Sequence, residues 1–269
     1  MRTACSVIWK IKDLDTIYVM MCVIFRMTKL LIKQGEGSDI KIMKIRWNGL
    51  TSSDLKWIAI ISMLVDHFAV AIYANMADYQ FDIYRVMRGI GRIAFPIYCF
   101  LLMEGFYHTH DVKRYISRCF LFAVISEVPF DLAIHGTWFY PEGQNVFFTL
   151  AIGLCTLYAI SVCERRGMSI ISSALCVLIG AGTAQFLETD YHYMGVLCIV
   201  LFYYLQRFDK VQRTVLGAVM VGVAEPKAAI AFFPIYLYNG ERGMKLKYFF
   251  YWVYPVHLLV LGLIRVILY

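Results

Sequence analysis

Apolar segments of the length that crosses a membrane follow one another from residue 55 to residue 268. A helix rises 1.5 Å per residue, so about 20 apolar residues cross the hydrocarbon layer of a bilayer. Two of the segments are shorter, which is typical of half-helices or re-entrant segments. The pattern predicts an all-α, polytopic transmembrane bundle of about nine spans (roughly eight to ten). The predicted spans are 55–75, 86–107, 115–134, 145–163, 168–187, 192–206, 212–224, 228–238 and 248–268.

The composition favours a lipid environment over that of a soluble domain. Hydrophobic residues make up 60% of the 269 positions and charged residues only 17%, and the mean hydropathy is +0.63. The net charge of +7 comes from short basic runs between apolar segments, so we expect no nucleic-acid partner. The eight cysteines include no C-x-x-C pair, and His108, His110 and Asp111 lie in a basic loop without a further convincing ligand. We therefore expect no metal site.

Lysines and arginines gather on one side of the predicted bundle. Fifteen of them occupy alternate loops and the segment before the first span, whereas the opposite loops contain acidic residues and a single basic residue, Lys227. Cytoplasmic loops carry the excess of Lys and Arg in membrane proteins. We therefore expect a multi-pass protein in the lipid bilayer of the inner (cytoplasmic) membrane, with the residues before the first span in the cytoplasm. The fifteen are Lys41, Lys44, Arg46, Lys56, Lys113, Arg114, Arg118, Arg165, Arg166, Arg207, Lys210, Arg213, Arg242, Lys245 and Lys247.

The N-terminal region does not have the pattern of a secretory signal. Its apolar stretch, 17–25, is followed by Arg26 and Lys29 instead of a small-residue cleavage site. A helix-entry signature, the capping box at residues 51–54, begins downstream. We divide the chain into an N-terminal extension, 1–42, and a transmembrane domain, 43–269. The extension is either disordered or amphipathic, or it precedes a true start at Met43.

Lys56 and His67 share one face of the first predicted helix. Eleven residues separate them, and eleven steps of 100° return to within about 20° of the starting direction, about 16 Å further along the axis. The lysine then lies at the cytoplasmic surface and the imidazole just past mid-bilayer. A phosphate-bearing acyl carrier held at Lys56 would deliver its acyl group near His67, which is suited to take a proton near neutral pH. The alternative is a snorkelling lysine and a histidine bonded to a neighbouring helix.

Charged residues within the spans need partners. Arg85, Arg88 and Arg92 fall on one stripe of the second predicted span. An unpaired guanidinium at the depth of Arg92 is costly, and Glu127 on the third span lies at a similar depth. We expect these two residues to meet near His67, although a purely structural ion-pair network is the alternative. Asp66 points about 100° away from His67, so we expect it to brace another helix. The catalytic candidates are His67, Arg92 and Glu127, and the candidates for binding substrate or acyl-CoA are Lys56, Arg88, Arg85, Asp131, Asn145 and His257.

Short motifs in a fixed order along the chain resemble the TraX family. They are LKWIAIISMLVDH at 55–67, GRIAFPI at 91–97, EGF at 104–106, SEVPFD at 126–131, QNVFFT at 144–149 and YPVHL at 254–258. The similarity covers essentially residues 43–269. The namesake of this family N-acetylates the pilin of a conjugative plasmid. The resemblance therefore implies an inner-membrane acetyltransferase that uses acetyl-CoA.

TraX proteins are in turn similar to the membrane acyltransferases that decorate cell-surface glycans. The first helix of those enzymes carries a basic residue, ten intervening residues and an essential histidine. Lys56 and His67 match this spacing, with lysine in place of the commoner arginine. We expect His67 to act as general base for an acceptor amine or hydroxyl, Arg92 to lie near the developing oxyanion, and Glu127 to orient one of them. The acceptor stays open between a protein N-terminus, a glycan and another group. A transporter or flippase with an anionic-substrate site at mid-membrane is the alternative function.

Overall fold

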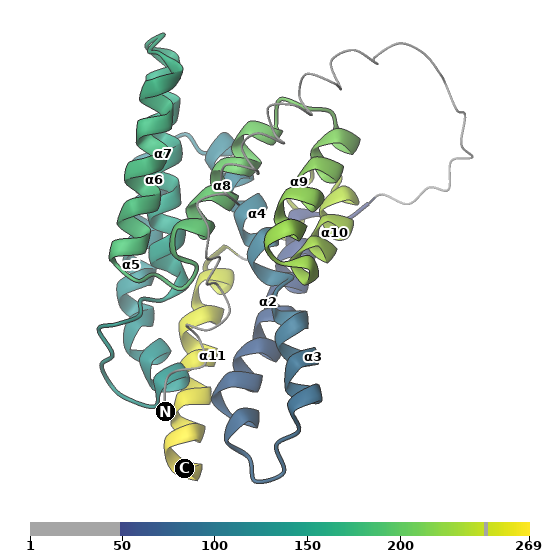
Figure 1. Ribbon diagram of the computed structural model, residues 1–269, viewed down its shortest axis with the longest axis vertical. Helices are drawn as coiled ribbons and strands as arrows, with labels where there is room; N and C mark the ends of the chain where they lie inside the picture. Colours follow the sequence, from purple (N-terminus) through teal and green to yellow (C-terminus); the bar gives the residue numbers. More distant parts are fainter. Residues whose placement is uncertain (1–48, 245–246) are drawn as a thin grey trace, which may run out of the picture. The chain divides into compact units, whose positions relative to one another are not determined.

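The computed structural model describes residues 49–244 and 247–269, which form a bundle of helices (Figure 1). Within these ranges there is no strand, and β-type pairing is limited to two isolated bridges, Leu50 with Tyr238 and Gln144 with Thr189. The all-α prediction is therefore confirmed. The predicted extension, 1–42, and the candidate start, Met43, lie outside the described residues.

Ten α-helices are described, together with short helical turns that continue or connect them. The α-helices are α2 (Ser52–Ala71), α3 (Phe81–Gly91), α4 (Ala94–His108), α5 (Val112–Phe130), α6 (Val146–Arg165), α7 (Ile170–Phe186), α8 (His192–Leu205), α9 (Lys210–Ala224), α10 (Phe232–Tyr236) and α11 (Lys247–Leu268). The turns are η1 (Tyr73–Asn75), η2 (Asp131–His135) and η3 (Pro226–Ala231).

Four helical stretches in the described ranges are long and apolar enough to span a membrane. They are Ser52–Asn75, Phe81–His108, Val146–Arg165 and Tyr248–Leu268, and they correspond to four of the predicted spans. Two further apolar helices, α7 and α8, are shorter. The chain is thus a membrane protein with several spans, whereas the predicted count of nine is not confirmed.

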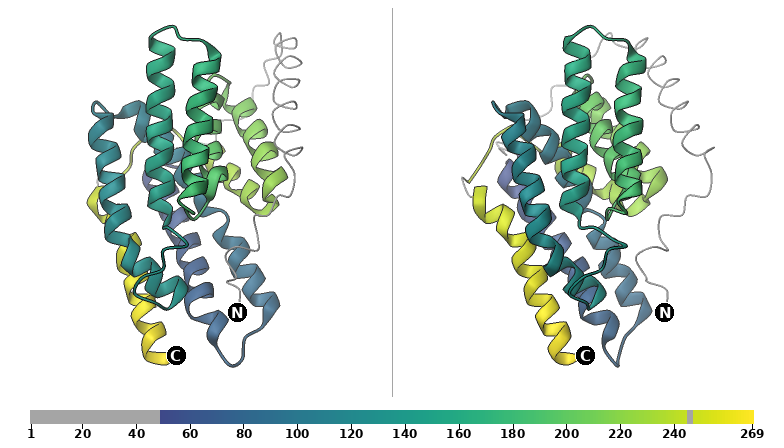
Figure 2. Two further views of the ribbon diagram at one scale, coloured as in Figure 1. Left: turned by 60° about the vertical axis from the view of Figure 1, so that its left-hand side comes forward. Right: turned by 90° about the vertical axis from the view of Figure 1, so that its left-hand side faces the viewer.

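Helix α2 carries two residues of the candidate site, Asp66 and His67. It contacts α3 and α4 on one side and α11 on the other (Figure 1). Helices α5, α6 and α7 follow one another side by side, and α11 runs along α5 (Figure 2). Side chains that α2 directs toward α11 or toward α3 are therefore shielded by neighbouring helices.

The second predicted span is not one continuous helix. It is divided into α3 and α4, with Arg92 and Ile93 in the break. Proline has no backbone N–H and its ring clashes with the carbonyl four residues earlier. Pro96 lies four residues after Arg92, so it cannot donate the helical hydrogen bond to the Arg92 carbonyl. Arg85 and Arg88 therefore lie on α3 itself, and Arg92 lies just beyond its last residue.

The predicted capping box is confirmed. The side chain of Thr51 accepts a hydrogen bond from the Asp54 amide, and the Asp54 carboxylate accepts one from the Thr51 amide at 2.8 Å, so the capping box is complete. Pro129 lies inside α5, and two residues later α5 gives way to the wider turn η2. Helix α2 consequently starts at a defined residue, which fixes the register of His67.

Candidate functional site

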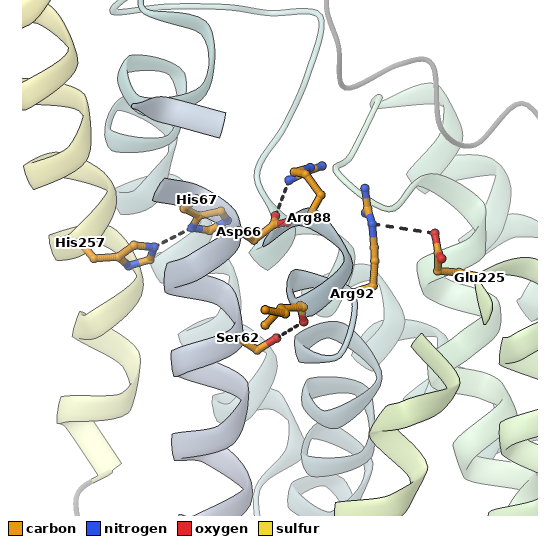
Figure 3. Close-up of polar contacts among 8 residues, drawn as sticks. Ser62, Asp66, His67, Arg88, Arg92, Glu225 and His257 are labelled. Carbon is orange, nitrogen blue, oxygen red and sulfur yellow. Dashed lines mark hydrogen bonds and ion pairs between the residues drawn. The ribbon is translucent and has the colours of Figure 1, made fainter. Parts of the chain in front are cut away.

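Two histidines far apart in the chain are in direct contact. Nδ1 of His67, on α2, lies 2.6 Å from Nε2 of His257, on α11. The two rings are almost parallel, at 3°, with their centroids 4.9 Å apart, and they point toward one another from the two helices (Figure 3). Nδ1 of His257 in turn lies 2.6 Å from the carbonyl oxygen of Val253. The sequence assigned His257 to substrate binding. The contact agrees with the alternative stated for His67, a histidine bonded to a neighbouring helix, although His257 was not named as its partner.

Aromatic rings connect this histidine pair to the rest of the bundle. The buried ring of Tyr254 lies edge-on to both imidazoles, with centroids 5.9 Å from His67 and 5.7 Å from His257. Phe147, at the start of α6, lies edge-on to Tyr254 at 5.1 Å. These contacts restrict how far either imidazole can rotate.

Two ion pairs lie beside the histidines. Arg88 Nη1 is 2.5 Å from Asp66 Oδ2, so Asp66 braces α3, as predicted. Arg92 Nε is 3.9 Å from Glu225 Oε2, at the junction of α9 and η3 (Figure 3). The four side chains are only 11–16% exposed. The acidic partner of Arg92 is thus Glu225, and the prediction that Glu127 would meet Arg92 is corrected. The physical reason is that the Glu127 carboxylate is engaged by Asn145, whereas Glu225 lies within ion-pair distance of Arg92.

A third carboxyl group, not predicted from the sequence, belongs to the same region. Asp190 lies in the turn between α7 and α8. Burial raises the pKa of Asp190 to about 6, the nearby charge of Asp66 adds to this rise, and the charges of Arg92 and Arg88 oppose it. Acidic residues are conspicuous in loops that are otherwise poor in charge, and that signal was available for both Asp190 and Glu225.

Glu127 and Asn145 form a separate hydrogen-bonded unit. Asn145 is fully buried, and its Oδ1 accepts a hydrogen bond from the Phe147 amide at 3.0 Å, which caps α6. Its Nδ2 donates to the Ala123 carbonyl at 2.7 Å and to the Glu127 carboxylate. These bonds engage the whole amide of Asn145, so they tie the start of α6 to α5.

Asp131 and Arg85 each contact a residue close to them in the sequence. Asp131 Oδ2 accepts a hydrogen bond from the Tyr140 amide at 2.8 Å, which holds the loop that follows η2. Arg85 is exposed and lies over the ring of Phe81, with its guanidinium carbon 5.6 Å from the centroid. Neither contact involves the histidine pair.

A cavity of about 540 Å³ opens among α2, α4, α5, α6 and the segment before α11. Its walls carry three cationic side chains, Lys56, Arg118 and Arg242, one carboxylate, Glu104, and several aromatic rings. Lys56 Nζ lies 4.9 Å from the centre of the Phe250 ring, and within the described ranges none of the three cations forms an ion pair with an acid. Phe147 also lines the cavity, so a chain of ring contacts runs from the cavity wall through Tyr254 to His67.

The fold and the site define a helical integral membrane protein with a polar centre beside a cation-lined cavity. The family described as TraX protein matches residues 51–265, and the chain belongs to this family. The chain is 26% identical, over 77% of its length and 92% of the relative, to the probable fimbrial assembly protein FimC, serogroup H1, of Dichelobacter nodosus. It is also 29% identical to an uncharacterized protein of Rickettsia prowazekii (strain Madrid E), over 39% of this chain and 35% of that one. No solved structure matches the chain significantly.

Proposed function

We propose that this chain is an acyltransferase that moves an acetyl or other short acyl group from acyl-CoA to an acceptor. The observation that carries the proposal is the cavity with three cations that have no acidic partner in the described ranges. The rings of Phe147 and Tyr254 lie between its wall and His67, which does not itself line the cavity. Phosphate groups bind where cations are not already neutralised. The cavity volume also falls in the range of pockets that hold small molecules and cofactors.

His67 acts as the general base. It takes the proton from the acceptor nitrogen or oxygen as that atom attacks the thioester carbonyl carbon. The new bond to the acceptor forms, the carbon–sulfur bond breaks, and His67 returns the proton to the departing thiolate. Protons and charges balance without any further reactant.

A guanidinium stabilises the oxygen that becomes negative during the attack. Arg88 is paired with Asp66, the chain neighbour of His67, and its charge acts on the His67 ring. Arg92, the sequence-based candidate, is held by Glu225. We propose Arg88 as the closer of the two to the reacting atoms, with Arg92 as the second positive charge. Stabilisation of this kind typically contributes a factor of about 100 to 1,000 in rate.

The acceptor we favour is the N-terminal amine of a pilus subunit. The Dichelobacter relative is named a probable fimbrial assembly protein. A general base can take the proton of an attacking amine as well as that of a glycan hydroxyl. The protein would lie in the inner membrane with the start of α2 on the cytoplasmic side, because the cations of the cavity belong to the face that the loop charges assign to the cytoplasm.

The test is acyl transfer by purified protein in detergent. Wild-type protein incubated with radiolabelled acetyl-CoA should release free CoA and transfer label to a synthetic peptide that begins with a free amine. His67→Ala should abolish both, whereas His110→Ala, in the exposed loop before α5, should not. Full activity of the His67→Ala protein would exclude the proposed role.

A transporter is the second candidate, because the helix break at Arg92 and the short turn η3 are features of membrane proteins with an ion or substrate site at mid-membrane. A wild-type protein that transfers no label but moves anions across a liposome membrane would favour the transporter.

A further inference from the structure

We infer that His257 is a positioning residue that fixes the tautomer of His67, so that Nε2 is the basic nitrogen of the site. The consequence for catalysis rests on the proposed function, but the tautomer itself does not. The inference comes from the two short contacts of His257 and from the number of hydrogens that each atom can carry.

The carbonyl of Val253 determines which nitrogen of His257 carries a hydrogen. A carbonyl oxygen can only accept a hydrogen bond. At 2.6 Å from that oxygen, Nδ1 of His257 must therefore carry a hydrogen. A neutral imidazole carries one hydrogen, so Nε2 of His257 has a lone pair. The pair is enclosed by helices and ring contacts rather than by carboxylates, and such surroundings favour the neutral form of a histidine.

His257 in turn determines which nitrogen of His67 carries a hydrogen. Nδ1 of His67 lies 2.6 Å from the lone pair on His257, so it must donate the hydrogen. The near-parallel rings and the 4.9 Å centroid separation show that the imidazoles lie end to end, with donor and lone pair directed along one line. Nε2 of His67 is therefore left without a hydrogen, and it can accept a proton.

The same contacts separate this role from direct binding of acyl-CoA. Both ring nitrogens of His257 are engaged, one by Val253 and the other by His67. Neither is left for a phosphate or a carbonyl of the substrate. When Nε2 of His67 takes a proton, the hydrogen on Nδ1 of His67 stays directed at Nε2 of His257, and the Val253 carbonyl at the far end stabilises the positive charge.

A matched pair of substitutions tests the inference. His257→Gln keeps an acceptor atom near the position of Nε2, whereas His257→Leu keeps a similar volume without an acceptor. We expect His257→Leu to lower kcat roughly 10- to 100-fold at unchanged KM for acetyl-CoA, and His257→Gln to recover most of this loss. A raised KM with unchanged kcat in His257→Leu would mean that His257 binds the donor, and it would overturn the inference.

A second readout does not depend on activity. In protein labelled with the heavy nitrogen isotope in its histidines, the two neutral tautomers give different nitrogen NMR signals, and His67 is identified by the signals that His67→Ala removes. Wild-type His67 should carry its hydrogen on Nδ1. A hydrogen on Nε2 would overturn the inference, even if the His257 variants fail to fold. If wild-type protein transfers no acyl group but His67 has the expected tautomer, the proposed function fails and the positioning contact stands.

Discussion

Arg92 is paired with Glu225, which joins the break between α3 and α4 to the junction of α9 and η3. Both side chains are mostly buried, at 11% and 16% exposure. Removing one member of such a pair leaves the other charge without a partner. The contact therefore ties together two parts of the bundle that are distant in sequence.

This pair predicts a coupled loss of stability. Arg92→Gln and Glu225→Gln should each lower the thermal stability of the protein in detergent. The double variant should lose less stability than the two single variants lose together. The expected coupling is about 0.5 to 3 kcal/mol, measured as a double-mutant cycle. Strict additivity would mean that the contact contributes nothing to folding.

Arg88 and Arg92 should differ in their effect on rate. Because Arg88 is tied to the neighbour of His67, Arg88→Gln should reduce kcat roughly 100-fold or more. Arg92→Gln should reduce kcat less, since Arg92 is held by Glu225. Single-turnover transfer from acetyl-CoA measures both, and the reverse order would restore Arg92 as the residue at the oxyanion.

The three cations of the cavity should act on donor binding rather than on chemistry. Lys56→Gln, Arg118→Gln and Arg242→Gln should each raise KM for acetyl-CoA several-fold to roughly tenfold, and added salt should weaken binding to wild-type protein. Arg166→Gln, an exposed arginine that does not line the cavity, is the control. Equal effects of all four variants would indicate general charge attraction instead of a defined site.

Gly91 should tolerate no side chain. A methyl group added there would overlap the side chain of Asp66, whereas one added at Gly182 would meet open space. Gly91→Ala should therefore disturb the Asp66–Arg88 pair, lowering both thermal stability and transfer activity, and Gly182→Ala should leave both unchanged. A fully active and stable Gly91→Ala protein would show that α2 and α3 can separate at no cost.

Asp190 predicts a dependence of stability on pH. Its pKa of about 6 in the folded protein lies above the ordinary value of 3.8, so the folded state binds the proton more tightly than the unfolded state. The contribution of Asp190 should lower the free energy of unfolding as the pH rises from about 4 to about 6. Above that range the contribution should no longer change with pH. Asp190→Asn should therefore be more stable than wild type at about pH 8, with the difference vanishing near pH 4. Thermal unfolding at the two pH values measures it.

His67 and Arg92 could be identified from the sequence as polar residues within the spans, but their contact partners could not. Hydropathy and the capping box placed α2 and the register of His67, because both signals are local. The partners of Arg92 and His67 come from α9–η3 and α11, and such long-range contacts leave no periodic trace in one sequence. Pro96 was the available signal for the break at Arg92, but the acidic partner of Arg92 depends on the fold. Depth alone suggested Glu127, which instead binds Asn145.

The two ion pairs beside His67 also bear on how the protein responds to an energised membrane. Two guanidinium groups and two carboxylates sum to zero, so a transmembrane voltage exerts no net pull on Asp66, Arg88, Arg92 and Glu225 as a group. Neutralising any one of them leaves an uncompensated elementary charge, on which 100 mV does up to about 2.3 kcal/mol of work over the full membrane thickness. The two pairs therefore add no net charge beside His67, and the carboxylate of Asp190 is the charge of this region that they do not compensate.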